Sequence, residues 1–169
     1  MRGMLLAAGL LLALAHGVAA QEFDCVAGFC LDQPVALDAP DAGWQVEDWP
    51  DPEVCTQVSG GSLPDGVGML LRDGRVARFE IGLSGGDDVP SPVAPFGIRR
   101  GMSLAEAGAR LPAEGLDVDM HKHAWPPGLY VTWRDATHDR ALRVELPDAE
   151  VEVILWGRAD AVRLSEGCV

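Results

Sequence analysis

The sequence predicts an α+β protein: an antiparallel sheet of five to six strands with one packed helix, and a disulfide-pinned acidic N-terminal segment. Three observations support this class. A hairpin signal spans residues 67–81, a helix-start signal begins at Ser103, and apolar residues alternate at period two in several stretches of residues 116–155. The composition fits a packed domain, because 48% of the 169 residues are hydrophobic.

Residues 1–20 have the three parts of a secretory signal peptide. Arg2 supplies the positive start, an apolar run follows from Met4 to Ala15, and Val18-Ala19-Ala20 places small residues before a cut preceding Gln21. The run is shorter than the ~20 apolar residues that span a bilayer, and no later segment is apolar enough to do so. We therefore expect a periplasmic or secreted protein with a cleaved signal peptide, no membrane span and no lipid anchor.

The cysteines predict two disulfides, because an even count in an exported chain indicates paired thiols. They are Cys25, Cys30, Cys55 and Cys168. Three connectivities are possible, of which we favour Cys25–Cys30 and Cys55–Cys168. A zinc site built from all four is disfavoured, because the chain has no C-x-x-C pair.

Acidic residues are concentrated near the start of the expected mature chain. The formal net charge is -13, and residues 21–71 contain ten acids and no base. We expect residues 21–66 to be an irregular acidic segment with a disulfide loop that packs through Trp44 and Trp49. The spacing of a calcium-binding loop is absent, which favours a solvated acidic face. The charge also argues against nucleic acid as a partner.

Residues 67–169 are expected to hold a hairpin, a helix and the rest of the sheet, in one domain with residues 21–66. In the hairpin, Val67–Arg72 and Arg75–Ile81 flank Asp73-Gly74, a pair that suits a type I′ turn. Further strands are expected from alternating apolar residues, in four groups: Leu116, Val118 and Met120; Leu129, Val131 and Trp133; Leu142, Val144 and Leu146; and Val151, Val153 and Leu155.

The helix signal is a capping box, in which Ser103 and Glu106 satisfy free amides at the start of a helix. Pro112 marks its expected end. A faint internal repeat accompanies these elements, because the spacing of Asp73, Val76 and Gly82 recurs at Asp148, Val151 and Gly157. Duplication and chance recurrence of hairpin chemistry both fit this repeat.

The helix-start segment Phe96-Gly-Ile-Arg-Arg-Gly-Met-Ser-Leu-Ala-Glu-Ala107 resembles a family pattern. It is similar to the segment that opens the helix of a small α+β module in outer-membrane assembly lipoproteins of the SmpA/OmlA type and in β-lactamase inhibitor proteins. The stretch from Asp73 to Cys168 resembles small exported bacterial proteins of unassigned function. The resemblance implies protein–protein contacts and not catalysis. This chain departs from those families, because it lacks a cysteine at the expected mature N-terminus and has one copy of the helix motif.

The chain offers few motifs for chemistry. No serine lies in a G-x-S-x-G elbow and no nucleotide fingerprint is present, so we predict no catalytic residues and no cofactor. His121 and His123 are weak candidates for copper or zinc, because their spacing places two imidazoles on one side of a strand. The spacing fixes no third ligand, and a polar strand end that faces water is the favoured alternative.

The remaining candidates form a binding surface. Trp125 lies in a turn of prolines and glycine, where an exposed aromatic would anchor a partner. Trp49, Asp48 and Asp51 lie in the acidic segment. We therefore predict an exported, non-catalytic protein that binds another exported protein with a basic surface. A metal-binding protein using His121 and His123, and an unrecognised hydrolase, are the alternatives.

Overall fold

The structure is a computed structural model that describes residues 23–38, 43–46, 55–82, 91–124 and 128–164. Its strands form a large antiparallel sheet of eight strands and a small sheet of two. The small sheet consists of β1 (Cys25–Val26) and β2 (Phe29–Cys30). The large sheet consists of β3 (Trp44–Val46), β4 (Cys55–Gly60), β5 (Val67–Arg72), β6 (Arg75–Ile81), β7 (Leu116–Met120), β8 (Leu129–Arg134), β9 (Arg140–Leu146) and β10 (Val153–Arg158).

The predicted α+β class is wrong, because the described residues are mostly β-structure. The α-helices α2 (Leu104–Gly108) and α3 (Ala159–Val162) are short, and a 3₁₀ turn η1 (Pro95–Gly97) precedes α2. The large sheet exceeds the predicted five to six strands because the segment expected to be irregular contributes β3 and β4. β4 was not predicted because its small and polar residues have little intrinsic preference for strand. Its pairing with β5 stabilises it as a strand.

The two local signals in the sequence are confirmed. β5 and β6 form a hairpin across Asp73-Gly74, and both turn residues have the positive φ of a type I′ turn (50° and 68°). Ser103 caps α2, with both hydrogen bonds of the capping box to Glu106 present. The helix is only five residues long. The capping box therefore predicted where the helix starts but not how short it is.

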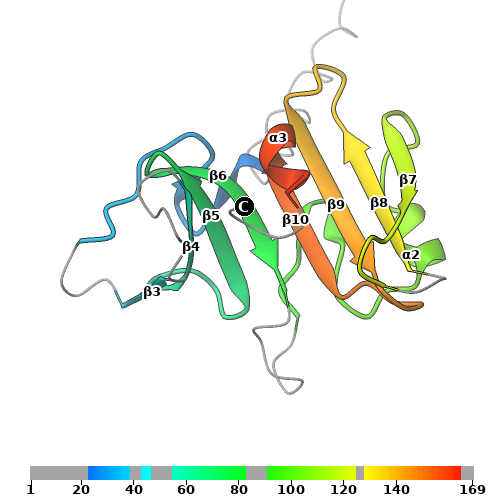
Figure 1. The fold of residues 1–169 in the computed structure, drawn as a ribbon, viewed down its shortest axis with the longest axis horizontal. Helices are drawn as coiled ribbons and strands as arrows, with labels where there is room; N and C mark the ends of the chain where they lie inside the picture. The colour runs from blue at the N-terminus through cyan, green and yellow to red at the C-terminus, as the bar shows by residue number, and fades with distance from the viewer. Residues whose placement is uncertain (1–22, 39–42, 47–54, 83–90, 125–127, 165–169) are drawn as a thin grey trace, which may run out of the picture.

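The order of strands in the large sheet is nearly symmetric. It runs β3-β4-β5-β6-β10-β9-β8-β7, so two four-stranded meanders join through their last strands (Figure 1). Ile154 of β10 lies opposite Ile81 of β6 at this junction. The repeated residues Asp73 and Asp148 lie in equivalent connections, between β5 and β6 and between β9 and β10. The fold therefore has the arrangement that a duplication would produce.

The two faces of the large sheet are covered differently. One face carries the main apolar core, which includes Phe79, Trp156, Ile98 and Ala107 of α2. The other face carries α3, whose Ala161 and Val162 pack on small apolar clusters. Figure 1 shows α3 in front of β10 and β9 and α2 behind the β7–β8 end of the sheet. β10, at the centre, is therefore buried on both faces.

One predicted disulfide is confirmed. Cys25 and Cys30 are bonded and lie opposite each other in the small sheet. Cys55 is also disulfide-bonded, but Cys168, the partner that we favour for it, lies outside the described residues. The described part of the chain contains no helix that is long and apolar enough to cross a membrane.

Candidate functional site

The face of the large sheet that carries α3 is rich in polar side chains, and we call it the polar face. Strand alternation predicts that these side chains meet solvent, but several are buried. The buried or largely buried members are Arg78, Glu80, Tyr130, Thr132, Arg143 and Glu145. A buried charged group destabilises a fold unless it is paired or hydrogen-bonded, so the partners of each group define what this face does.

Two buried arginines hold the end of α3. Arg78 donates from Nη1 to the carbonyls of Ala161 (3.0 Å) and Leu164 (2.7 Å), and its Nη2 pairs with Glu80 (2.8 Å). Arg143 donates to Thr132 Oγ1 (3.2 Å) and weakly to the carbonyl of residue 163 (3.4 Å). Because the last carbonyls of a helix lack partners within the helix, these guanidinium groups fix a helix of only four residues.

Glu145 is the least satisfied group on the polar face. It is 7% exposed, and its Oε1 has no hydrogen-bond partner among the described residues. Burial raises the pKa of Glu145, and the nearby charges of Arg143 and Arg78 oppose that shift only in part. Its Oε2 lies 3.6 Å from Nε2 of His121. Glu145 therefore lies beside an imidazole in a largely dry environment.

His121 is fixed by contacts on three sides. Its ring stacks on Tyr130 at 4.3 Å, and its Nδ1 accepts the backbone N–H groups of His123 (3.2 Å) and Ala124 (3.1 Å). This pattern leaves the proton on Nε2, which faces Glu145. Burial lowers the pKa of His121, with smaller contributions in the same direction from His123 and Arg143.

These contacts bear on the predicted metal site. His121 and His123 lie after the end of β7, in a turn and not in a strand, with ring centroids 6.3 Å apart. No group of three or more His, Cys, Asp or Glu side chains suited to a metal ion occurs among the described residues. Metal binding stays a prediction, which copper or zinc titration of the wild type and a His121→Ala/His123→Ala variant tests.

The other predicted site residues are not brought into this cluster. Trp125, Trp49, Asp48 and Asp51 lie outside the described residues. The acidic binding surface that they were expected to form therefore stays a prediction.

A groove of about 740 Å³ runs along the polar face beside the cluster. β7, β8 and β9 contribute to its lining, together with Asp160 of α3 and the two residues that follow this helix. Its charged and aromatic lining residues are Asp119, Lys122, Tyr130, Arg134, Arg143, Asp160 and Arg163. Arg143 lies over the Tyr130 ring, 4.9 Å from its centroid.

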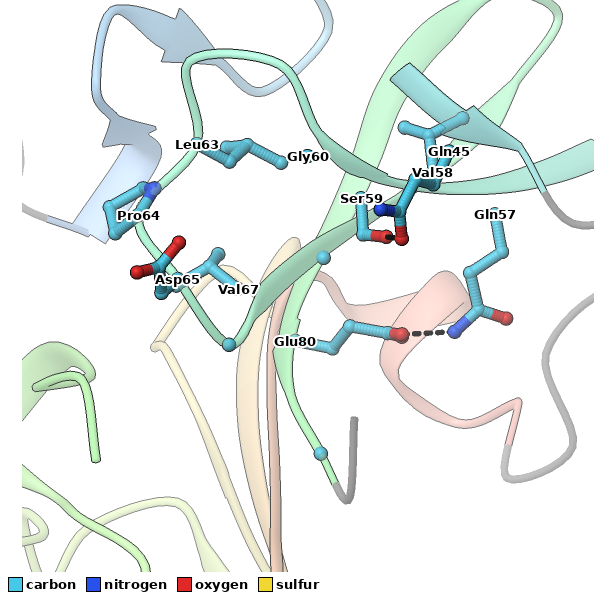
Figure 2. A pocket seen from close by; sticks show the side chains of 13 residues that line it. Gln45, Gln57, Val58, Ser59, Gly60, Leu63, Pro64, Asp65, Val67 and Glu80 are labelled. Atoms are coloured by element: carbon cyan, nitrogen blue, oxygen red, sulfur yellow. Dashed lines mark hydrogen bonds between the residues drawn. The ribbon is translucent and has the colours of Figure 1, made fainter. Parts of the chain in front are cut away.

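A smaller cavity of about 190 Å³ lies at the other half of the sheet, between β4, β5 and the connection between them. Figure 2 shows two of its lining residues, Gln57 and Glu80, pointing toward each other, and the Gln57 amide donates to the Glu80 carboxylate. Gly68 leaves room for Glu80, because a Cβ at this glycine would lie 3.1 Å from Glu80 Cγ. Since Arg78 and Gln57 both bond Glu80, this carboxylate is already satisfied.

Sequence reasoning missed Arg78, Arg143 and Glu145 because their alternation with apolar residues is typical of a solvent-facing side. These side chains are buried in part because α3 covers them. The sequence did not predict α3, because this helix has only four residues and no capping side chain. No protein-family model, curated protein or solved structure matches this chain. The resemblance to the assembly lipoproteins and the β-lactamase inhibitor proteins therefore stays a prediction.

Proposed function

We propose that this protein is an exported, non-catalytic binding module that captures an extended segment of another protein at the outer edge of β7. The observation that carries the proposal is an edge strand with exposed apolar side chains. β7 ends the large sheet, and Val118 and Met120 are 53% and 60% exposed. Exposed edges of this kind are the sites at which proteins add a partner strand.

Export is supported by two features. The signal-peptide pattern of residues 1–20 predicts transfer across a membrane, and the Cys25–Cys30 disulfide fits an oxidising compartment. The partner is then expected to be an exported protein as well.

The backbone of β7 determines how a partner strand would bind. In its pairing with β8, Gly115 accepts from Arg134 N–H and His121 donates to the carbonyl of Gly128. Along an antiparallel strand, the backbone N–H and C=O groups of successive residues point alternately toward one neighbouring strand and away from it. The odd-numbered residues between Gly115 and His121 therefore also bond toward β8. The N–H and C=O groups of Leu116, Val118 and Met120 therefore point away from the sheet and are available to an added strand.

The side chains of β7 determine which segment would fit. Val118 and Met120 extend the core face of the sheet, while Asp117 and Asp119 extend the polar face. The Asp117 side chain is 55% exposed, and its contact with Arg134 is long, at 3.9 Å. In a segment that alternates apolar with basic residues, the apolar side chains would lie beside Val118 and Met120, and the basic side chains beside Asp117 and Asp119.

A second copy of this chain fits the edge poorly. When β7 pairs antiparallel with its own copy, every two-fold register that overlaps three or more residues places an aspartate opposite an aspartate. Like charges directly opposite destabilise a strand pair. The proposal therefore commits to a different protein as the partner.

The arrangement of the titratable cluster supports a non-catalytic role. Glu145 and His121 have the carboxyl and imidazole groups that acid–base catalysis uses, but neither lines the groove or the smaller cavity. His121 is held by its hydrogen bonds and by its stacking on Tyr130, and Glu145 is buried beside it.

The test uses a synthetic peptide of alternating valine and lysine, about eight residues long, with fluorescence anisotropy as the readout. We expect salt-sensitive binding, weaker binding of a valine–glutamate peptide, and a loss of about tenfold or more in a Val118→Pro variant, because proline removes the outward N–H. Val118→Thr is the matched control, since it keeps the N–H and the branched Cβ. Equal binding by the proline and threonine variants, or no binding of the lysine peptide, would overturn the proposal.

A further inference from the structure

The groove on the polar face has a charge opposite to that of the whole protein. The chain carries a net charge of -13, and Lys122 is its only lysine. Four of the 13 basic residues line this one groove, together with two carboxylates. The four are Lys122, Arg134, Arg143 and Arg163.

The carboxylates of the groove do not balance these cations. Asp160 is engaged elsewhere, because it pairs with Arg72 (2.8 Å) and Arg158 (3.2 Å), neither of which lines the groove. Among the described residues, Asp119 forms no ion pair within 4.0 Å, and neither does Lys122 or Arg163. The groove therefore has excess positive charge.

Arg143 gives this groove a fixed anion-binding group. The residue is 8% exposed, its Nε and Nη1 donate to Thr132 and to the carbonyl of residue 163, and its plane lies over Tyr130. Its Nη2 makes no hydrogen bond among the described residues, and no carboxylate in this part of the chain pairs with it within 4.0 Å. A buried guanidinium with a free donor is strongly favourable to an anion that completes its bonding.

We propose that this groove binds a small organic oxyanion, a molecule bearing two or more carboxylate, sulfate or phosphate groups. Arg143 binds one group through Nη2, and Arg134, Arg163 and Lys122 bind the rest from the rim. A volume of about 740 Å³ suits a ligand of this size. The groove shares Asp119 with the β7 edge, but it would bind an anion through arginines, whereas the edge would bind a basic segment. The anionic probes and the valine–lysine peptide therefore test the two proposals separately.

The test is isothermal titration calorimetry at low salt with three probes: inorganic phosphate, citrate, and a hexapeptide of glutamate. We expect citrate to bind most tightly and the Arg134→Gln/Arg163→Gln variant to lose about tenfold in affinity. The control is Arg99→Gln/Arg110→Gln, which removes the same charge outside the groove and leaves the affinity nearly unchanged. In the wild type, citrate is expected to shift the ¹⁵Nε resonance of Arg143.

Three results would overturn the proposal. The first is that neither phosphate nor citrate binds. The second is that the control variant loses as much affinity as the groove variant, since this would show only a general charge effect. The third is that only the glutamate peptide binds, because acidic side chains of a protein would then be the ligand in place of a small molecule.

Discussion

Nε2 of His121 lies 3.6 Å from Oε2 of Glu145, and each side chain is only 10% exposed. One residue belongs to β9 and the other follows the end of β7, so the pair joins the interior of the sheet to the turn after its edge strand. Burial favours the neutral form of both groups. The pair therefore links the stability of the protein to pH in two opposite ways.

We expect Glu145→Gln to stabilise the protein at neutral pH by roughly 1–2 kcal/mol, because it replaces a buried carboxylate with a neutral group of the same shape. Burial raises the pKa of Glu145. The stability from its neutral form is therefore fully present below the ordinary carboxyl pKa and is lost as pH rises through the raised value. Urea unfolding of the variant and the wild type from about pH 4 to pH 8 measures this. A variant that is less stable than the wild type at neutral pH would show that the carboxylate is favourably paired.

His121 is expected to have the opposite effect. Its pKa is lowered mainly by burial, so its contribution to stability is present above the ordinary imidazole pKa of ~6.5 and is lost as pH falls. Protonation of Nδ1 would also remove the acceptor for the N–H groups of His123 and Ala124. An NMR titration of the imidazole carbons measures the value directly. The groups that face this ring are Glu145, Glu152, His123, Arg143 and Tyr130, and a pKa of 6.5 or higher would show that the acids dominate.

Removal of the Cys25–Cys30 disulfide is expected to lower the free energy of unfolding by about 2 kcal/mol. The effect is modest because this disulfide closes a short loop and constrains the unfolded chain little. The measurement is urea unfolding of Cys25→Ala/Cys30→Ala. The large sheet does not contain either cysteine, so its far-ultraviolet circular dichroism should be unchanged. Complete unfolding of the variant would mean that the small sheet supports the whole fold.

Gly157 is expected to tolerate no side chain. Its φ is 147°, and a Cβ there would lie 2.6 Å from the carbonyl oxygen of Ala77 and 2.9 Å from Arg78 Cα. Both are backbone atoms, so Gly157→Ala should destabilise by about 3 kcal/mol or more. The control is Gly108→Ala in α2, where nothing lies within 4 Å, and this change should stabilise by about 0.5–1 kcal/mol. Thermal unfolding measures the Tm of both variants. Similar Tm values would contradict the close approach of β10 to the backbone of β6 at Gly157.

The parts of the fold that the sequence predicted are those specified by local chemistry. Asp73-Gly74 fixes a hairpin because few residue pairs accept two positive φ angles, and Ser103 with Glu106 fixes a helix start. β3 and β4 were missed because pairing with distant strands stabilises them and their residues carry weak local preference.

The candidate site was harder to predict for a related reason. Polar alternation in β6 and β9 is typical of a solvated face, yet α3 buries Arg78 and Arg143 there. Only long-range packing reveals that these arginines hold the helix. His121 was singled out for its spacing to His123, whereas its Nε2 lies 3.6 Å from Glu145, on a strand that the spacing does not involve.

Amide hydrogen exchange of β7, measured by NMR with and without the valine–lysine peptide, tests the central claim most directly. We predict that the outward amides of Val118 and Met120 become protected on binding. The inward amides of Asp117 and Asp119, already bonded toward β8, should change little. Binding without new protection at Val118 and Met120 would contradict strand addition at this edge.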